Sequence, residues 1–305
     1  MKIVVVGPGA MGCLLAGKLA AVNHIVWLVD HDRQRSQTIN RRGIRIADRN
    51  GVSRFRVPCT ISAREIGTSP LVFLCVKSYN LQSAIRKVIP VLETDTIVVL
   101  IQNGLGNVER ISPFVDKKRI VCLTTSHGAT CAGPGYIRHE GTGPTCIASA
   151  VKSEIDKAKL VAGILSGAGL EVSVQEDIDA MIWGKLVINS AINPITAIYN
   201  VRNGVLLKRK KLRELMHGVA LEVANVARAK GIKLPYSDVT AVVDAVCQKT
   251  AGNISSMLQD IRKGKRTEIG CITGAVIKEA RRVNVPVPLC EMLAKQIAHK
   301  TKKGG

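Results

Sequence analysis

The sequence predicts an α/β protein with a doubly wound parallel sheet in its N-terminal domain and an all-helical C-terminal domain. Three observations support this fold class. Short apolar runs alternate with helical patterns up to about residue 175, a glycine-rich turn follows the first run, and long helical patterns replace the runs from Asp177 onward. Alternating strands and helices are typical of parallel sheets that are covered by helices on both faces.

The size and composition of the chain agree with this organisation. The chain has 305 residues, which is longer than a domain with a single hydrophobic core usually is. Two domains are therefore expected, at residues 1–175 and 176–305. Apolar residues make up 46% of the chain but aromatic residues only 3%, so the core has to be built from aliphatic side chains. A parallel sheet that is buried on both faces requires such a core.

Composition also limits the cellular compartments and the classes of binding partner that are expected. No run of about 18 uninterrupted apolar residues is present, so no transmembrane helix and no membrane partner are expected. The nine cysteines form no CxxC pair, which predicts reduced thiols in a cytoplasmic protein and no metal site. The net charge of +21 is scattered and few aromatic residues accompany it, which favours a solvated surface over nucleic-acid binding.

The pattern of apolar residues predicts the individual elements. In the N-terminal half, strands are expected at residues 2–6, 25–29, 71–76, 97–101, 120–124 and 170–174, helices at 11–21, 80–92 and 154–168, and a hairpin or loop at 131–145. In the C-terminal half, helices are expected at 178–192, 211–230, 236–262 and 268–283.

A glycine-rich loop joins the first expected strand to the first expected helix. Its sequence is Gly7-Pro8-Gly9-Ala10-Met11-Gly12. In a strand–turn–helix unit the first glycine makes the tight turn, the second admits a pyrophosphate, and the third lets the helix pack closely on the sheet. The motif therefore predicts a dinucleotide site and identifies residues 1–175 as a Rossmann-type domain.

The end of the second expected strand indicates two different dinucleotides. Asp30 stands where an acidic side chain accepts hydrogen bonds from ribose hydroxyls, which favours NAD(H). His31, Arg33 and Arg35 follow, and basic side chains of this kind hold the 2′-phosphate of NADP(H). The residues alone leave both cofactors open.

Two further polar residues follow expected strands. Lys77 comes after the run at 71–76, and Asn103 after the run at 97–101. Ligands of open α/β sheets bind beyond the carboxyl ends of the strands, so both side chains are expected to face the cofactor. Taken alone, each residue is better explained as a surface lysine and as part of an Asn-Gly turn.

A polar face is expected on the first helix of the C-terminal domain. Lys185, Asn189 and Asn193 recur every four residues in an otherwise apolar segment, so they share one side of a buried helix. Burial penalises a charged lysine and moves its pKa toward the range that serves proton transfer. The alternative is a snorkelling lysine with capping asparagines near Pro194.

A second polar set lies further along the chain. Asn253 and Ser256 are expected to share a helix face, and a basic loop that ends at Glu268 follows them. By itself this pattern is also typical of an amphipathic helix with a charged connector.

Taken together, four segments resemble the 2-dehydropantoate 2-reductase (ketopantoate reductase) family. They are GPGAMG, IQNGLGN, WGKLVINSAINPITAIYNVRNG and NISSMLQDIRKGKRTEIG, and the resemblance extends from residue 1 to about residue 290. It implies an oxidoreductase that reduces 2-dehydropantoate to pantoate with NAD(P)H, a step of pantothenate and coenzyme A biosynthesis. The partner it implies is a small 2-keto acid.

The resemblance also implies residue roles. Lys185 would be the general acid, and Glu268 would help to set its protonation state. The substrate would be held by Asn103, Lys185, Asn189, Asn193, Asn203, Asn253 and Ser256. The cofactor would be contacted by the glycine loop and by Asp30, His31, Arg33, Lys77, Asn103, Ala129 and Glu268.

One departure and two alternative functions remain. The family commonly has a basic residue that reads the 2′-phosphate where this chain has Asp30-His31. NADP(H) is therefore the family default, and NAD(H) is the alternative. A reductase of a related 2-keto acid and, more distantly, a basic Rossmann-type binding or redox-sensing protein are the alternative functions. The apolar helical domain is compatible with a homodimer.

Overall fold

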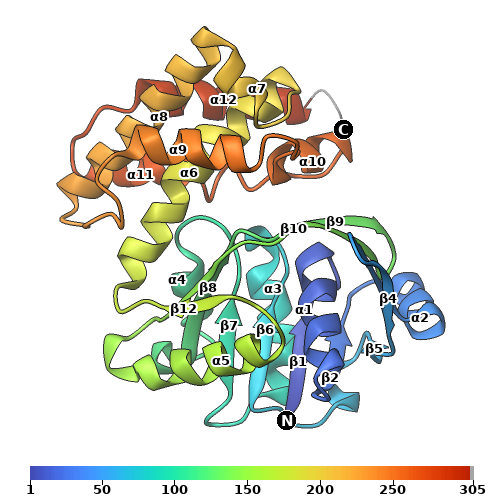
Figure 1. The fold of residues 1–305 in the computed structure, drawn as a ribbon. Helices are drawn as coiled ribbons and strands as arrows, with labels where there is room; N and C mark the ends of the chain where they lie inside the picture. The colour runs from blue at the N-terminus through green and yellow to red at the C-terminus, as the bar shows by residue number, and fades with distance from the viewer. Residues whose placement is uncertain (303–305) are drawn as a thin grey trace. The chain divides into compact units, whose positions relative to one another are not determined.

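The computed structural model describes residues 1–302, which form two compact units (Figure 1). Unit 1 comprises residues 1–102 and 107–178, and unit 2 comprises residues 103–106 together with the chain from Asp179 onward. Each unit has a hydrophobic core of its own. Unit 1 is built on a β-sheet and the described part of unit 2 is helical, so the predicted fold class is confirmed.

Unit 1 contains an eight-stranded sheet in the order β12-β11-β8-β7-β6-β1-β2-β5. Its strands are β1 (Lys2–Val6), β2 (Ile25–Val29), β5 (Cys59–Thr60), β6 (Leu71–Leu74), β7 (Ile97–Leu100), β8 (Ile120–Thr125), β11 (Thr145–Ser149) and β12 (Val172–Val174). The strands from β8 to β5 run parallel, and only β11 and β12 run against them. The chain first builds outward from β1 through β2 and then returns to β6 on the other side, which makes the sheet doubly wound.

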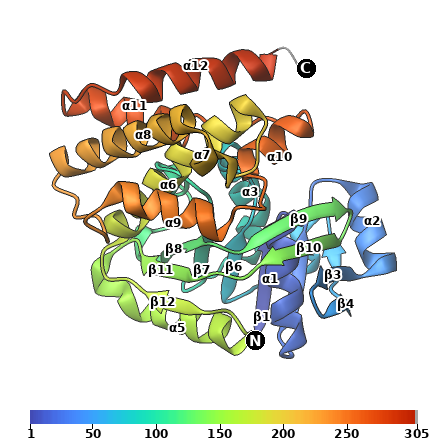
Figure 2. The ribbon, with the colours of Figure 1, turned by 45° about the horizontal axis from the view of Figure 1, so that its top comes forward.

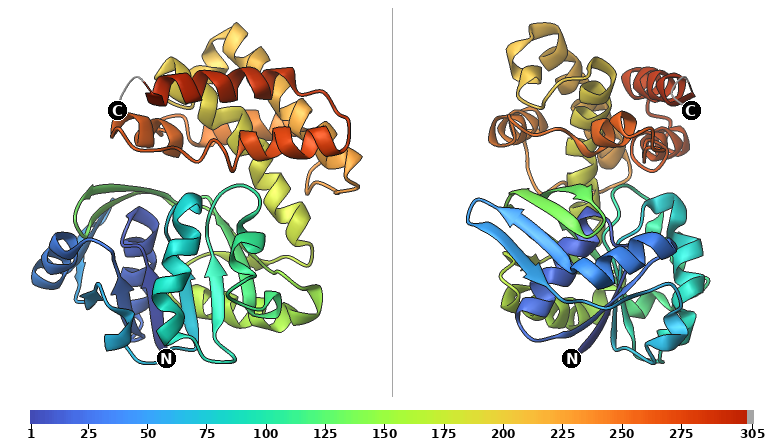
Figure 3. Two further views of the ribbon diagram at one scale, coloured as in Figure 1. Left: turned by 180° about the vertical axis from the view of Figure 1, so that it is seen from behind. Right: turned by 90° about the vertical axis from the view of Figure 1, so that its right-hand side faces the viewer.

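Helices cover both faces of this sheet. Helices α1 (Ala10–Ala21) and α5 (Ile155–Gly167) lie over one face, and α3 (Leu81–Val88) and α4 (Asn107–Ile111) lie over the other (Figure 1, Figure 3). Because both faces are covered, the central strands are almost wholly apolar and buried. Short 3-10 turns occur at Ala63–Glu65, Ser78–Asn80, Ile89–Val91, Lys117–Arg119 and Lys152–Glu154.

A second, four-stranded sheet in unit 1 was only half predicted. Its order is β4 (Gly51–Phe55), β3 (Ile44–Asp48), β10 (Tyr136–Gly141) and β9 (Gly128–Gly133). The antiparallel pair β9–β10, visible in Figure 2, is the hairpin expected near residues 131–145. The pair β3–β4, its parallel pairing with β10, and the helix α2 (Arg33–Arg42) were not predicted.

Unit 2 is a helical bundle in its described residues. Its helices are α6 (Ile178–Tyr199), α7 (Val205–Lys208), α8 (Lys210–Ala229), α9 (Val239–Lys249), α10 (Ser256–Arg262), α11 (Thr273–Arg282) and α12 (Pro288–Lys302). Helix α8 contacts α7, α9, α11 and α12, and Figure 2 shows α8, α11 and α12 side by side. Fully buried side chains such as Met216, Val243 and Leu293 form the core between them.

Two of the helix predictions for this half need correction, and the short helix α7 was not predicted. The helix expected at 178–192 continues through Pro194 to Tyr199, since proline removes only one backbone hydrogen bond and the surrounding bundle holds the helix in place. The single helix expected at 236–262 is two helices, because Asp238 caps the start of α9 and Ser255 caps a new start at α10. The helix α12 was not predicted at all.

The described residues were searched for membrane-spanning helices, metal-binding clusters and disulfides. In residues 1–302 no helix is both long enough and apolar enough to cross a membrane. The same residues contain no cluster of three or more histidine, cysteine or acidic side chains that could hold a metal ion. None of the nine cysteines, all of which lie within residues 1–302, takes part in a disulfide.

Candidate active site

The glycine loop turns the chain tightly between β1 and α1. Gly7 has a φ of +94°, which side-chain-bearing residues rarely adopt, and its N–H donates to the carbonyl of Val29 at the end of β2 over 2.9 Å. A Cβ at Gly12 would lie 2.1 Å from the carbonyl oxygen of Gly7. Both positions therefore need glycine for the turn itself and for the close approach of the helix.

Gly9 serves the loop in a different way. It is exposed, and a Cβ built there would meet no protein atom within 4 Å. Gly9 is also the N-cap of α1, which has neither a side-chain cap nor an acidic residue in its first turn. Protein atoms thus leave space beside Gly9 at the N-terminus of α1, and the N–H groups and positive end of a helix suit the diphosphate of a dinucleotide.

The other members of the loop and the residues expected around it take varied positions in unit 1. Pro8 is buried, whereas Ala10 and Met11 are half-buried at the start of α1. Lys77 is half-buried after β6, at the N-cap of a 3-10 turn. Ala129 is half-buried in β9 and packs against the core of unit 1.

The end of β2 carries the residues expected to read the adenosine ribose. Asp30 is 3% exposed and forms an ion pair with Arg35, while His31 and Arg33 are exposed. Burial by itself would raise the pKa of Asp30, but the hydrogen bond and charge of Arg35 outweigh it and hold that pKa below its usual range. Asp30 is therefore an ionised, internally paired carboxylate.

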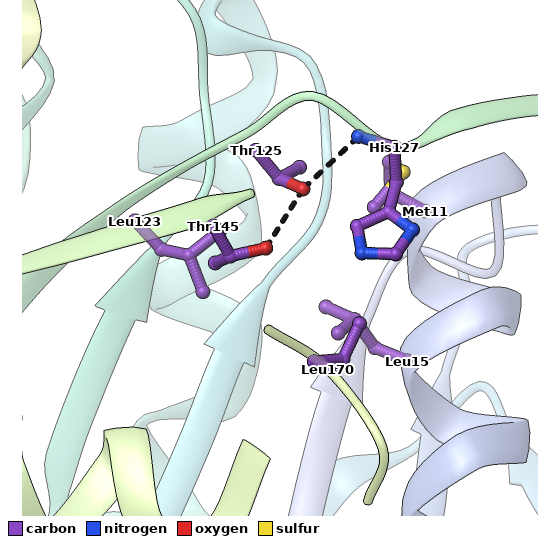
Figure 4. Close-up of a pocket in the computed structure, with 7 residues that line it drawn as sticks. All are labelled: Met11, Leu15, Leu123, Thr125, His127, Thr145 and Leu170. Carbon is purple, nitrogen blue, oxygen red and sulfur yellow. Dashed lines mark hydrogen bonds between the residues drawn. The ribbon is translucent and has the colours of Figure 1, made fainter. Parts of the chain in front are cut away.

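A histidine pair near the loop was not predicted. His127 Nδ1 lies 2.9 Å from Nε2 of His139 in β10, and the two rings stack with centroids 5.1 Å apart. Figure 4 shows His127 at a small cavity, together with Met11 of the glycine loop and Thr125 and Thr145, whose hydroxyls are hydrogen-bonded. Burial, with the nearby His139 and Lys18, lowers the pKa of His127 to about 4, so the pair is uncharged near neutral pH.

In unit 2 the polar face of α6 forms as the spacing predicts. Asn189 and Asn193 are 8% and 7% exposed, and Lys185 is half-buried on the same helix. The start of this face is held by Tyr236, whose hydroxyl donates to the carbonyl of Gly184 over 2.8 Å. A lysine amino group and two amides are therefore aligned along one side of a largely buried helix.

Asn103 reaches this face from a different part of the chain. Residues 103–106 belong to unit 2 by their contacts, and Asn189 Nδ2 donates to Asn103 Oδ1 over 3.1 Å. The segment is fixed by Leu105, whose N–H donates to the carbonyl of Cys271 over 2.9 Å, and by Gly104, which has a φ of +87°. Asn103 thus lies beside the polar face of α6, although it follows a strand of unit 1.

Glu268 lies in the segment that holds Asn103. It is 6% exposed, and its backbone carbonyl accepts hydrogen bonds from the N–H groups of Cys271 and Ile272 over 3.0 and 3.1 Å. Since Cys271 in turn accepts from Leu105, the backbone turn at Glu268 supports the loop that carries Asn103.

Asn203 and Asn253 are brought together through the backbone. The N–H of Asn203 donates to the carbonyl of Asn253 over 3.1 Å, and its Nδ2 donates to Thr250 Oγ1 over 2.9 Å. Asn203 Oδ1 is buried and has no hydrogen-bond partner in the described chain. A buried acceptor of this kind points to a donor that a ligand would supply.

The expected helix face shared by Asn253 and Ser256 is wrong. Asn253 lies in the loop before α10, while Ser256 is the first residue of that helix and is exposed. The loop forms because Ser255 caps the helix, accepting from the N–H of Leu258 over 3.2 Å. Ser255 Oγ also lies 2.7 Å from Thr196 Oγ1 of α6, a link between two site segments that the sequence analysis missed.

Comparisons with known proteins identify the family. Residues 3–152 match the family described as "Ketopantoate reductase PanE/ApbA", and residues 177–301 match "Ketopantoate reductase PanE/ApbA C terminal". A 2-dehydropantoate 2-reductase of Pyrococcus horikoshii is 35% identical over 306 residues, covering 100% of this chain and 99% of the relative.

Solved structures extend the comparison to the fold. A PanE/ApbA family ketopantoate reductase from Ralstonia eutropha superposes with a TM-score of 0.90 at 29% identity, covering 100% of this chain and 99% of that chain. A D-mandelate dehydrogenase, solved with NADH and anilino(oxo)acetate, superposes with a TM-score of 0.94 at 26% identity and the same coverage. Because both halves of the chain match and the curated relative covers its whole length, this chain belongs to the ketopantoate reductase family.

Proposed function

We propose that this protein reduces 2-dehydropantoate to pantoate with NAD(P)H and thereby serves pantothenate and coenzyme A biosynthesis. The observation that carries the proposal is the polar face of α6, where Lys185, Asn189 and Asn193 stand in an otherwise apolar and largely buried helix. A lysine and amides in such surroundings suit a small anionic substrate that becomes protonated during the reaction. Membership of the reductase family supports the same reaction.

Reduction of the keto group requires a hydride at C2 and a proton at the carbonyl oxygen. The reduced nicotinamide supplies the hydride when it is bound. Lys185 donates the proton from its ammonium group to the carbonyl oxygen, so that C=O becomes CH–OH and the lysine is left as a neutral amine that takes its next proton from solvent. Glu268, which is buried, helps to set the protonation state of Lys185.

The asparagines and the serine bind the rest of the substrate. Asn103, Asn189 and Asn193 offer amide groups along α6 to the carboxylate. Asn203 Oδ1, which is buried without a partner in the described chain, suits a donor such as the C4 hydroxyl of 2-dehydropantoate. Asn253 and Ser256 complete this set, held near α6 by the link between Ser255 and Thr196.

The cofactor is bound mainly by unit 1. The loop Gly7-Pro8-Gly9-Ala10-Met11-Gly12 holds the diphosphate, and Lys77, Asn103, Ala129 and Glu268 contact the remainder. Asp30, His31 and Arg33 lie at the adenosine end. NADP(H) is the family default, and NAD(H) stays open because of Asp30 and because the related D-mandelate dehydrogenase was solved with NADH.

A reductase of another 2-keto acid is the second candidate function. The likeness to D-mandelate dehydrogenase favours it, since mandelate is a 2-hydroxy acid with an aromatic group in place of the branched tail of pantoate. The polar residues of unit 2 recognise a carboxylate and a carbonyl, which both substrates share. Only the residues around the tail would then differ.

Two further proposals concern location and assembly. We infer a cytoplasmic enzyme, an inference supported by nine cysteines in the described residues, none of which forms a disulfide. A homodimer remains a prediction, which light scattering coupled to size-exclusion chromatography would test.

The reaction is tested by initial-rate assays with two substrates and two cofactors. 2-Dehydropantoate and 2-oxo-2-phenylacetate are each assayed with NADPH and with NADH. We expect kcat/KM for 2-dehydropantoate to be at least about 10-fold higher, because a site shaped for a branched tail with a hydroxyl rejects a flat ring. The reverse order would favour the second candidate, and no turnover with either acid would overturn the proposal.

A further inference from the structure

The carboxylate of Asp30, at the carboxyl end of β2, is already bound within the protein. Its side chain is 0% exposed. Arg35 Nε donates to Oδ2 over 2.6 Å, and Arg35 Nη2 donates to Oδ1. The backbone N–H groups of His31 and Asp32 also donate to Oδ1, over 2.7 and 3.3 Å.

These bonds leave Asp30 little capacity for a ribose. An ionised carboxylate offers about four acceptor positions, two on each oxygen. Three donors crowd Oδ1 and Arg35 Nε takes one position of Oδ2, so at most one position is left. Two of these donors come from a guanidinium in the fork geometry that makes arginine–carboxylate pairs strong. To accept hydrogen bonds from the two ribose hydroxyls, Asp30 would have to break a buried, bidentate ion pair, which is costly because it leaves a charge unpaired.

Arg35 is held in place by the same arrangement. Its side chain is 28% exposed, so it is not closed off from solvent. Asp30 engages two of its five N–H donors, and three remain for a ligand. The backbone of Arg35 is fixed as well, because its N–H donates to Asp32 Oδ1, the N-cap of α2, over 3.0 Å.

The position of this pair relates it to the cofactor loop. Gly7 N–H donates to the carbonyl of Val29, the residue directly before Asp30, so the glycine loop and the end of β2 are joined. In dinucleotide-binding sheets this strand end meets the adenosine ribose. The exposed side chains there are those of His31 and Arg33, and both are basic.

We propose that Asp30 does not bind the ribose but positions Arg35, and that Arg35 binds the 2′-phosphate, so that this chain prefers NADPH although it carries the acid of an NADH enzyme. The inference rests on the proposed dinucleotide site. Arg35 alone forms the bidentate pair with Asp30, and Arg33 and His31 contribute positive charge beside it. The lowered pKa of Asp30 agrees with a carboxylate that stays ionised in this pair.

Nucleotide fragments test the proposal without turnover. Adenosine 2′,5′-bisphosphate and 5′-AMP differ only in the 2′-phosphate, and their Kd values are measured by titration calorimetry. The native protein is expected to bind the bisphosphate about 10- to 100-fold more tightly, the range for charge-assisted hydrogen bonds to one group. Equal affinities would overturn this inference alone. Binding of neither fragment would overturn the dinucleotide site as well, and turnover assays report separately on the substrate.

Three variants separate the roles of the pair. The double variant Asp30→Asn/Arg35→Met removes both charges together, which avoids an unpaired buried charge, and should abolish the preference for the bisphosphate while leaving the Kd of 5′-AMP within about twofold. Asp30→Asn alone should weaken bisphosphate binding a few-fold because Arg35 is no longer held. Asp30→Glu, which keeps a carboxylate, should restore part of this loss.

Controls and contrary outcomes are equally specific. Arg42→Ala removes an exposed arginine at the last turn of α2 and should change neither Kd. Thermal melting of each variant verifies that it is folded. If Asp30→Asn weakens 5′-AMP about 10-fold or strengthens the bisphosphate, Asp30 reads the ribose or repels the phosphate, and the proposal is wrong. An unchanged preference in the double variant would equally exclude Arg35 as the phosphate ligand.

Discussion

The two units build their candidate site residues in contrasting ways. In unit 1 the glycine loop depends on missing side chains: Gly7 and Gly12 make the turn possible, and Gly9 leaves space for a ligand. In unit 2 the polar face depends on side chains that come from distant segments, and the bond between Asn103 and Asn189 joins residues 86 positions apart. The first site is damaged by adding atoms, and the second by removing or displacing them.

The largest effect is expected from removing a side chain in unit 2. Lys185→Ala eliminates the proposed general acid, so kcat should fall about 100-fold or more, the usual scale for such a group. The dinucleotide Kd should stay within about twofold, because the glycine loop lies in unit 1. Lys211→Ala, at an exposed position of α8, is the matched control. A kcat near the native value would show that another group protonates the substrate.

Adding single methyl groups to the glycine loop should distinguish glycines that the fold of the loop requires from glycines that leave space for the cofactor. Gly12→Ala puts a Cβ 2.1 Å from the carbonyl oxygen of Gly7, and the overpacking should cost about 1–3 kcal/mol of stability. Gly9→Ala meets no protein atom within 4 Å, so the melting temperature should hardly change while the dinucleotide Kd rises about 10-fold. Calorimetry and thermal melting measure both quantities. If Gly9→Ala bound the dinucleotide normally, the cofactor would not approach this position.

The loop that carries Asn103 combines both kinds of dependence. Gly104→Ala would place a Cβ 2.1 Å from the carbonyl oxygen of Cys271 at a φ of +87°, so Asn103 should be displaced from Asn189 and kcat/KM should fall about 10-fold. Gly106→Ala is the matched control, because its φ is +79° but nothing lies within 4 Å. It should cost only about 1 kcal/mol of backbone strain. Equal kinetic losses in both variants would show that strain, and not the position of Asn103, sets the rate.

The same contrast explains how much the sequence predicted. The loop at Gly7 and the strands around it could be predicted because six consecutive residues and short apolar runs carry all the information. The α6 face could be predicted from one helical spacing. In contrast, the pairing of β3 with β10 joins segments about 90 residues apart. Because β4 is mostly exposed, no local apolar pattern predicts the second sheet.

Long-range contacts also decided what was missed within the site. The break between α9 and α10 depends on Ser255. The hydrogen bond between Ser255 and Thr196 of α6 joins residues 59 positions apart, so the sequence did not indicate it. Asp30 was expected to be open to a ribose, yet Arg35, five residues later, folds back onto it when α2 forms. Residue types indicated the chemistry in both cases, but the partner that fixes each side chain became known only from the fold.

The smallest effect is expected at the His127–His139 pair of unit 1, and it concerns the pH dependence of protein stability. The pKa of His127 is lowered to about 4 by burial and by the neighbouring His139 and Lys18, against about 6.5 in an unfolded chain. Between these values the unfolded chain binds a proton that the native state does not, so stability falls as the pH drops from 7 toward 4. The pKa of His139 is lowered too, by burial and Lys18 and against the opposing charge of Asp48, which adds to the same slope. His127→Gln should therefore reduce the fall in the free energy of unfolding between pH 7 and pH 5 by up to about 1 kcal/mol after solvent screening, measured by denaturant titration at each pH. His299→Gln, at an exposed position in α12, should not change this fall. An unchanged slope in His127→Gln would show that protonation of His127 does not cause the loss of stability in this pH range.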